Sequence, residues 1–445
     1  MAIVIYPHLA HDKSLNQATD FFSMSISSLV PSRLSARQVL PAIAGIYISQ
    51  TIITALTTQA LPSLLRDAGA SLQVAGLTAL LWIPWGLRFL WAPAVERWRL
   101  PAGQLTRHSR TLVLTGQWLI AAVLLLLGLA ALGGVLSLSG HAGWILGGLL
   151  LAALVAATTD VASDGFTVEQ LASQQRGWGN VAQVGGSYVG AMLGAGGFLL
   201  VAGSAGWPWA LMAASLAVLL LSIPMLLLRE PPRDRALAVG HRPGLMHALR
   251  RPEIRIGLVL MLLSSVGVRL TLGMFGPFLL DKGLRLEQLG WLFGSLHIGA
   301  GLTGAFLGGI LVRTAPGWRA VWIAVGLKAL VLAALTLAAP TASLTVLMVL
   351  VGLMFAVLGF VWVALYSALM GLTSPLQSGV DFTLFQSADA LLAVAGGVAG
   401  GWLSQHLGYE VCFGLAAASA VVAVLVVRRK APSLDDKARG LTAYE

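Results

Sequence analysis

Two carboxylates stand four residues apart within one long apolar segment of the chain, residues 143–168. This spacing places the side chains of Asp160 and Asp164 on the same face of a helix. A neighbouring acid and apolar surroundings both disfavour an ionised carboxylate, so such a pair is suited to binding and releasing a proton. Asp160 lies deeper in the segment and is the stronger candidate. The alternative is a structural network in which these acids pair with arginines.

Two more charged side chains lie alone in apolar segments. Arg269 occupies the middle of residues 256–280, and Asp389 lies near the middle of residues 379–405. A guanidinium stays protonated in proteins, so Arg269 requires an anionic partner. That partner is either Asp389 or an anionic group of a substrate, and the sequence leaves both open. Asp389 is also predicted to join the two acids described above in proton coupling.

The elements that hold these charges are apolar along the whole chain. Of the 445 residues, 57% are hydrophobic and only 10% are charged, and the mean hydropathy is +0.83. A soluble domain carries about 25% charged residues. The composition excludes a disordered chain, a nucleic-acid-binding protein and a soluble enzyme with a single anchor. It predicts an all-α integral membrane protein.

The sequence predicts twelve transmembrane helices, because a bilayer core of about 30 Å needs roughly 20 apolar residues in a helix. The first six spans are 38–65, 71–95, 110–133, 143–168, 177–203 and 207–228, and the other six are 256–280, 287–312, 318–339, 342–370, 379–405 and 408–428. The predicted domains are an N-terminal tail (1–36), a six-helix bundle (37–228), a central loop (229–255), a second six-helix bundle (256–428) and a C-terminal tail (429–445).

The loops between the spans differ in basic charge. Of the 28 lysines and arginines, 22 lie in the two tails and in the loops that share their side, whereas 3 lie on the opposite side. Loops rich in lysine and arginine remain in the cytoplasm. We therefore expect both termini, the central loop and both tails to be cytoplasmic.

The two halves of the chain repeat each other. Pro62 begins a Pro-Ser-Leu-Leu run and Gln73 follows it eleven residues later, while Pro277 begins a Pro-Phe-Leu-Leu run and Gln288 follows at the same distance. Two parallel repeats of six helices are typical of the major facilitator plan, in which substrate binds near the membrane midplane between the halves. The repeat therefore predicts a central site between two bundles.

Other side chains in the spans complete the predicted sites. The substrate pocket around Arg269 is predicted to include Tyr47, Gln50, Trp82, Trp362 and Tyr366. The alternative role for the tryptophans is interfacial anchoring. A cytoplasmic gate is predicted from Arg88, Glu96, Arg97, Glu169 and Arg176, with Asp164 as an alternative member. Lys328, in the middle of the ninth span, is assigned to a structural pair or to snorkelling.

Motifs for other chemistry do not occur in the sequence. There is no Gly-x-x-x-x-Gly-Lys-[Ser/Thr] nucleotide loop, no His-Glu-x-x-His and no Gly-x-Ser-x-Gly. The single cysteine, Cys412, cannot form a disulfide within the chain. We expect no metal site, no cofactor and no enzymatic activity.

Two runs in the first half resemble a known group of transporters. The segments Ile83–Arg97 and Asp160–Phe166 are similar to siderophore permeases of the RhtX/FptX type, which are major facilitator proteins related more distantly to the muropeptide permease AmpG. The resemblance covers about residues 60–220 well and the second half weakly. The loop at Trp98–Pro101 departs from the glycine-arginine run of general facilitators. The resemblance implies proton-driven import of a metal–siderophore complex, loaded with iron or zinc, across the inner membrane.

The sequence leaves three candidate functions for this protein. The leading one is this importer, whose partners are a small-molecule substrate, protons and the lipid bilayer, and which is expected to be a monomer. The alternative is an exporter of drugs or of free siderophore, or a muropeptide permease. The third, a non-transporting sensor or enzyme, is disfavoured because no extra domain is present to signal or catalyse.

Overall fold

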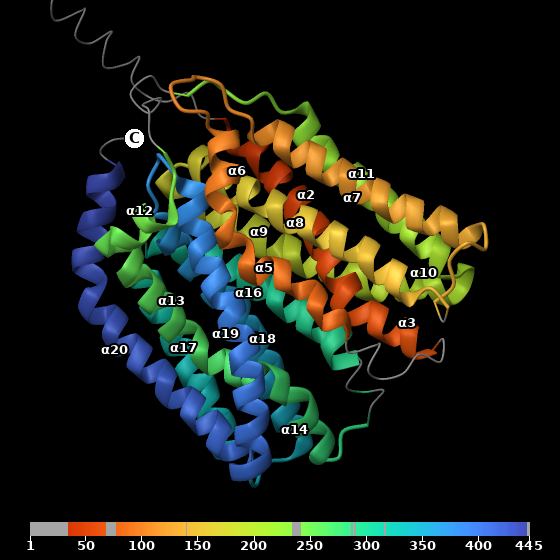
Figure 1. Ribbon diagram of the computed structural model, residues 1–445. Helices are drawn as coiled ribbons and strands as arrows, with labels where there is room; N and C mark the ends of the chain where they lie inside the picture. Colours follow the sequence, from red (N-terminus) through yellow and green to blue (C-terminus); the bar gives the residue numbers. More distant parts are fainter. Residues whose placement is uncertain are drawn as a thin grey trace, which may run out of the picture.

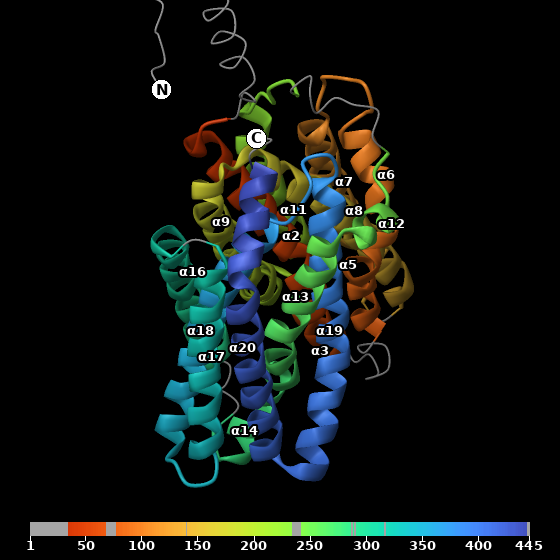
Figure 2. The same ribbon diagram turned by 90° about the vertical axis from the view of Figure 1, so that its left-hand side faces the viewer.

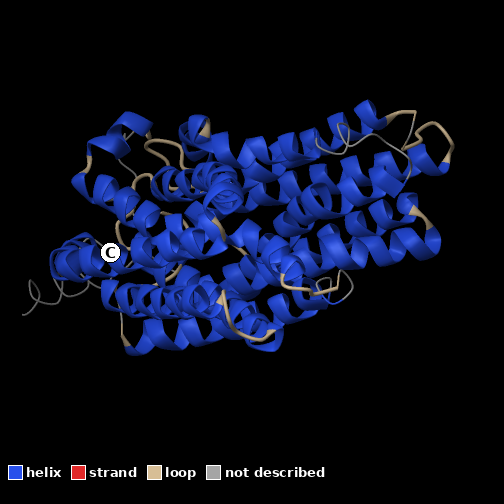
Figure 3. Ribbon diagram, turned by 90° about the horizontal axis from the view of Figure 1, so that it is seen from below, coloured by secondary structure: helices blue, strands red, loops and turns tan. Residues whose placement is uncertain are grey.

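The computed structural model describes residues 34–67, 77–138, 140–233, 242–285, 288, 291–315 and 317–442. All regular structure in these residues is helical (Figure 3). Most of the predicted N-terminal tail, and Gln73 of the repeat, lie outside the described residues.

The first half contains six helical spans, several of them interrupted. The first consists of α2 (Ala36–Ala55), a π-helical turn (Leu56–Ala60) and α3 (Leu61–Asp67). The second consists of a 3-10 turn (Leu77–Trp82), α5 (Ile83–Leu87), a 3-10 turn (Arg88–Leu90) and α6 (Ala92–Arg99). The others are α7 (Ser109–Leu132), α8 (Ala142–Gln170), α9 (Arg176–Ala191) with a π-helical turn (Met192–Gly197) and α10 (Phe198–Ala205), and α11 (Trp207–Leu227).

The second half repeats this arrangement. It contains α13 (Pro252–Thr271) with a 3-10 turn (Leu272–Met274) and α14 (Phe275–Asp281), then a π-helical turn (Leu292–Leu296) with α16 (His297–Thr314), α17 (Trp318–Ala338), α18 (Leu344–Met370), α19 (Ser378–Leu407) and α20 (Tyr409–Thr442). The short α12 (Leu245–Arg250) lies within the predicted central loop, and α20 continues into the predicted C-terminal tail.

The predicted membrane architecture is confirmed. Ten helices among the described residues are long and apolar enough to cross a bilayer, with mean hydropathies of 1.4 to 2.8. A shorter apolar helix, Leu80–Leu90, occupies the position of the second expected span, and Leu292–Thr314 that of the eighth. The helices therefore follow the twelve predicted spans in order.

Glycines allow helices to approach closely at equivalent places in the two halves. A Cβ atom at Gly194 would lie 2.4 Å from the backbone oxygen of Ile52, and one at Gly400 would lie 1.9 Å from that of Leu270. The fifth span therefore packs directly on the first, and the eleventh on the seventh. Membrane helices associate through such close backbone contacts, because lipid provides no hydrophobic driving force between them.

The same two spans end in matching turns. α10 meets α11 at Gly206, which has φ 97°, and α19 meets α20 at Gly408, which has φ 86°. A side chain would strain the backbone at these positive φ values, so glycine permits each span to reverse within one residue.

The two bundles meet at one end of the molecule and diverge toward the other. Figures 1 and 2 place α6 and α12 near the loop 100–108 and near the described loop residues 228–233 and 242–244, at what we call the basic-loop end. At the opposite end α3 and α14 lie apart in both views. Contacts between the halves join α8 to α19, and α9 to α16 and α18.

Candidate functional site

A buried arginine stands among acids at the centre of the molecule. Arg88 begins the 3-10 turn that interrupts the second span, and it is only 2% exposed. It forms an ion pair with Asp160 on α8, and its Nη2 lies 3.7 Å from Oδ2 of Asp164 on the same helix. Arg88, predicted as a gate residue, thus lies with the two predicted proton-site acids.

Two other helices hold Asp164 in place. Tyr47 on α2 donates its hydroxyl to Oδ1 of Asp164, and the amide of Gln386 on α19 donates to the same oxygen at 3.2 Å. Gln386 also accepts a hydrogen bond from Arg88. Because Gln386 belongs to the second half, this central cluster joins the two bundles.

The sequence analysis did not assign Gln386 to a functional site. The sequence did contain one indication of its role. Gln386 lies three residues before Asp389, and this spacing places the two side chains on the same face of a helix.

Two acids share one cation in this cluster. Oδ1 of Asp160 and Oδ2 of Asp164 accept no hydrogen bond from the described residues. With both acids ionised, the cluster carries one excess negative charge in apolar surroundings, and one bound proton removes it. Asp164 is the more enclosed acid, since its side chain is 0% exposed and that of Asp160 is 7% exposed.

A second charge pair lies in the other half. Nε of Arg269 on α13 donates to Oδ1 of Asp389 on α19 at 3.1 Å, and Nη2 donates to Oδ2. The ring of Trp362 on α18 lies 5.5 Å from the guanidinium carbon, within cation–π range. Of the two partners that the sequence left open for Arg269, the structure contains Asp389. The Arg269 side chain nevertheless remains 16% exposed.

The other predicted pocket residues described here pack against neighbouring helices. Tyr47 and Gln50 are each 5% exposed, and the amide of Gln50 donates to the Ser163 hydroxyl at 3.1 Å. Tyr366 packs its ring edge-on against Phe382 at 5.8 Å. Of the predicted pocket residues, Tyr47 and Trp362 contact the charged side chains directly.

An apolar cavity of about 1510 Å³ separates the second and eleventh spans. Trp82 lines it and stacks on Trp85 at 5.7 Å. The full lining is Thr58, Thr78, Leu80, Trp82, Ile83, Gly86, Leu87, Ala390, Leu391, Val394, Ala395, Val398, Ala399, Trp402 and Leu403.

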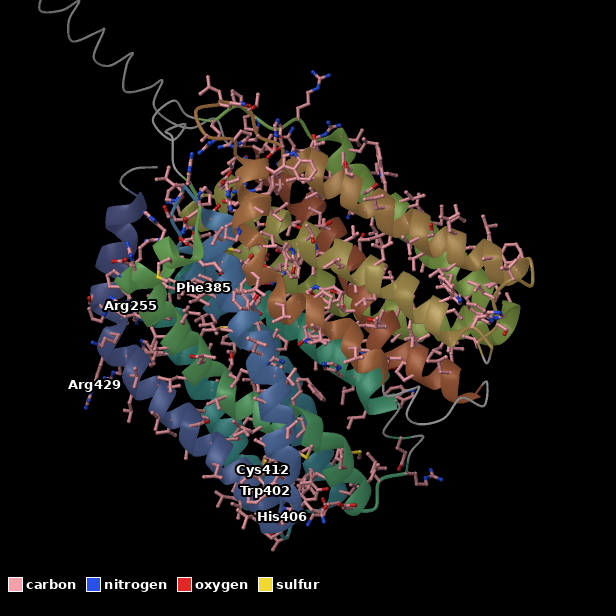
Figure 4. The ribbon with its side chains drawn as sticks, viewed as in Figure 1. Arg255, Phe385, Trp402, His406, Cys412 and Arg429 are labelled. Carbon is pink, nitrogen blue, oxygen red and sulfur yellow. The ribbon has the colours of Figure 1, made fainter. Side chains whose placement is uncertain are left out.

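The cavity runs from the charged centre toward the end where the bundles diverge. Leu87 and Ala390 in its lining directly adjoin Arg88 and Asp389 in the sequence. Trp402, also in its lining, lies near the far end of α19 (Figure 4).

A separate network closes the basic-loop end. Arg99 on α6 contacts Glu96 at 2.7 Å and Glu169 on α8 at 2.6 Å. Glu96 accepts the backbone N–H of Gly379 at 3.2 Å, and Glu169 accepts the hydroxyl of Ser378 at 3.2 Å. Because Ser378 and Gly379 begin α19, the network fastens the second bundle to the first.

The predicted gate residues are only partly in this network. Glu96 and Glu169 belong to it. Arg97 donates its Nε to the backbone oxygen of Pro93 in its own helix at 3.0 Å. Arg176 is buried at the first residue of α9, where its backbone oxygen accepts a hydrogen bond from Asn180 at 2.9 Å.

The cations of the network are residues that the sequence analysis did not select. Arg99 lies one helical turn after Glu96, and that spacing of three was the available signal. Arg107 comes from the loop before α7, and its Nε lies 3.5 Å from Oε2 of Glu169. No local pattern indicates the second contact, since the two residues are far apart in the sequence.

The central loop packs on the same end of the molecule. The backbone N–H of Arg233 donates to the oxygen of Leu105 at 2.7 Å. Burial lowers the pKa of the Arg233 guanidinium, while the charge of Glu169 acts in the opposite direction.

The sequence profile of the Major Facilitator Superfamily matches residues 41–375, which is most of the chain. The chain belongs to the Major Facilitator Superfamily. This assignment agrees with the two helical bundles and with the central charges between them, and it makes the protein a transporter rather than an enzyme.

Two relatives are similar in sequence. An uncharacterised protein of Haemophilus influenzae is 25% identical over 372 residues, which cover 79% of this chain and 85% of the relative. The anhydromuropeptide permease of Escherichia coli K12 is 26% identical over 276 residues, which cover 60% of this chain and 54% of the permease. The aligned part of the chain thus spans about half of the permease.

Solved transporters share the fold. The Escherichia coli fucose:proton symporter superimposes with a TM-score of 0.68 at 12% identity, covering 88% of this chain and 98% of that one. A bacterial homologue of the iron transporter ferroportin, in an outward-facing state with soaked iron, gives 0.63 at 17% identity, covering 89% and 99%. At these identities the similarity concerns the fold alone.

We predict that Gly379→Ala weakens closure of the basic-loop end of this transporter. A Cβ atom there would lie 2.5 Å from Oε2 of Glu96 and 3.0 Å from the oxygen of Val161, so the network must shift. Overpacking of this kind costs about 1–3 kcal/mol. The measurement is thermal unfolding of the purified protein in detergent.

The matched control is Gly397→Ala on the same helix, where nothing lies within 4 Å of the added atom. This variant should unfold at or slightly above the parent temperature, because alanine favours a helix over glycine. Equal unfolding temperatures for the two variants would contradict a close contact between Gly379 and Glu96.

Proposed function

We propose that this transporter imports an organic anion of the metal–siderophore class across the inner membrane, coupled to protons. The observation that supports this most is the separation of two charge groups. Arg88, Asp160 and Asp164 form a proton-binding group in the first half. In the second half, Arg269 is the anion-binding residue, and Asp389 balances its charge.

Substrate binding begins at Arg269 in this proposal. Its guanidinium is partly exposed and offers directional donors to a phenolate or carboxylate of a metal chelate. The ring of Trp362 beside it supplies an apolar surface for an aromatic group. The metal, iron or zinc, travels as part of the substrate.

Coupling then passes along α19. Asp389 contacts Arg269, and Gln386, one turn earlier on the same helix, contacts Arg88 and Asp164. An anion that competes with Asp389 for Arg269 therefore disturbs the helix that also supports the proton-binding group. Protonation of that group releases its excess negative charge and permits Arg88 and Gln386 to rearrange.

The expected orientation relates the two ends of the molecule to the two sides of the membrane. The basic loops are expected in the cytoplasm by the positive-inside rule. In that orientation the network around Arg99 closes the cytoplasmic end, and the cavity extends toward the periplasm. A monomer in this conformation is ready to accept substrate from outside. Both tails of the chain are then cytoplasmic.

A second candidate is import of anhydromuropeptides, favoured by the similarity to the permease of Escherichia coli. Such a substrate also carries carboxylates, so Arg269 suits either class. The two candidates differ in the body of the substrate: an aromatic metal chelate suits the apolar cavity wall and Trp362, whereas a sugar-peptide requires polar partners. The apolar lining therefore favours the chelate.

Transport into proteoliposomes tests the proposal. We expect radiolabelled iron or zinc, bound to a phenolate siderophore, to accumulate when the side of uptake is acidic. A protonophore should abolish that accumulation, because the gradient drives it. Transport of anhydromuropeptide alone would replace the leading function with the second candidate.

We predict that Asp160→Asn separates proton coupling from substrate exchange. Asparagine cannot bind the proton, and it leaves Arg88 balanced by Asp164 alone. Gradient-driven accumulation should therefore fall about tenfold or more, while exchange of labelled for unlabelled substrate at equal pH persists. The control is Glu410→Gln at the start of α20, which should accumulate substrate normally. Full accumulation by Asp160→Asn would assign this acid to packing.

We predict that Arg269→Ala abolishes transport although the protein still inserts. An arginine at a helix centre costs roughly 2.5–3.5 kcal/mol, so a binding role must offset this cost. If Asp389 is the only partner, the double variant Arg269→Ala, Asp389→Ala should regain much of the transport, because both buried charges are gone. If the substrate is also a partner, the double variant should remain inactive yet well folded. Normal uptake by Arg269→Ala would contradict both.

A further inference from the structure

Two close contacts between the halves lie on opposite flanks of the molecule. A Cβ atom at Gly301 on α16 would lie 2.2 Å from the ring of Tyr188 on α9, and one at Gly86 on α5 would lie 3.4 Å from the side chain of Leu391 on α19. Each glycine therefore receives a bulky side chain from the other half. The four helices overlap near the centre of Figure 1, whereas Figure 2 shows α5 and α19 on one side and α9 and α16 on the other.

The internal repeat relates the two glycines. Gly86 and Gly301 are 215 residues apart, and Pro62 and Pro277, which begin the two repeated runs, are separated by the same number. The second and eighth spans therefore present a glycine at equivalent positions, and each glycine faces a span of the other bundle.

The two side chains that these glycines receive are also equivalent. Tyr188 and Leu391 are 203 residues apart, and so are Gln183 and Gln386, which lie five residues before them. The fifth and eleventh spans thus contact the opposite bundle at the same level. The two contacts are a pseudosymmetric pair, as expected between repeats of this superfamily.

A line through the two contacts passes beside the charged centre of the molecule. Arg88 lies two residues after Gly86, and Asp389 lies two residues before Leu391. The two halves of such transporters rock against each other largely as rigid bodies around a central site. Two contacts on opposite flanks define an axis for this rotation, and residues on the axis move least.

We propose that the contact of Gly86 with Leu391 and that of Gly301 with Tyr188 are the pivots on which the two bundles rock. Both pivot contacts then persist while the two ends open in turn. Glycine suits this role, because it lets the backbones approach closely and leaves the opposing side chain free to turn without breaking an ion pair. The inference concerns the motion of the bundles, and it is independent of which substrate is carried.

A third contact, on the same flank as Tyr188 and Gly301, provides a matched control. A Cβ atom at Gly177 on α9 would lie 3.0 Å from the side chain of Val312 on α16. Each residue of this pair is eleven positions nearer to the basic-loop end than its counterpart in the pivot, which is about 16 Å along a helix. A rotation that leaves the pivot in place must separate this pair when the basic-loop end opens.

Cross-linking of the full-length transporter tests the inference. The parent is Cys412→Ala, which removes the only native thiol. Three variants of it carry paired cysteines: Gly86→Cys with Leu391→Cys, Tyr188→Cys with Gly301→Cys, and the control Gly177→Cys with Val312→Cys. Each variant is joined by the same short bis-methanethiosulfonate reagent, and its reduced form supplies the baseline.

The measurement is amide hydrogen exchange at the start of α19, residues 378–386. There Glu96 accepts the backbone N–H of Gly379, a contact that is broken when the basic-loop end opens. Cross-linking either pivot pair should change the exchange rate less than about twofold, because the bundles can still rock. Cross-linking the control pair should slow exchange about tenfold or more, because that end is then held closed.

Slowing by either pivot pair to the extent seen with the control would overturn the inference. Unchanged exchange in the cross-linked control would also overturn it, because the basic-loop end would then open without separating α9 from α16. If one pivot variant does not fold, the other decides by the same criterion. Hydrogen exchange requires no substrate, so a failure of siderophore transport leaves this test unaffected.

Discussion

The cost of placing charge in a low-dielectric interior governs the centre of this transporter. Each arginine or acid there needs a partner, and the partners come from different helices. Arg88 draws together the second, fourth and eleventh spans through Asp160, Asp164 and Gln386, and Tyr47 adds the first. This charged group is therefore one of the contacts that join the two bundles.

Helix interruptions occur beside these charges. The second span breaks into a 3-10 turn at Arg88, and the seventh breaks at Leu272, soon after Arg269. Backbone freed from the regular helix is tolerated in membranes only where protein or a cavity surrounds it. Close glycine packing of the fifth span on the first, and of the eleventh on the seventh, keeps each bundle compact around these breaks. Each bundle can then move as a unit.

The two ends of the interface are built differently. At the basic-loop end, Arg99, Glu96 and Glu169 form a hydrogen-bonded network with the start of α19. At the other end the walls between the second and eleventh spans are mostly apolar and line an open cavity. Breaking the ion pairs would leave buried charges without partners, whereas the apolar side chains of the cavity walls can move apart without unpairing any charge. This difference allows one end to remain closed while the other opens.

Hydropathy, basic-loop bias and the internal repeat were enough to predict the all-α membrane architecture, because the bilayer imposes length and polarity on each span locally. The buried acids and Arg269 were also recognisable, since any charge in an apolar span stands out. The partners were recognisable only in part: Asp389 was one of two partners offered for Arg269, whereas Arg88 was expected in a gate, and Gln386 and Arg99 were not assigned to these networks. Pairing depends on which helix faces meet, and those contacts join residues far apart in the chain. Only the tertiary structure decided that Arg88 holds the two acids and that Asp389 is the partner of Arg269.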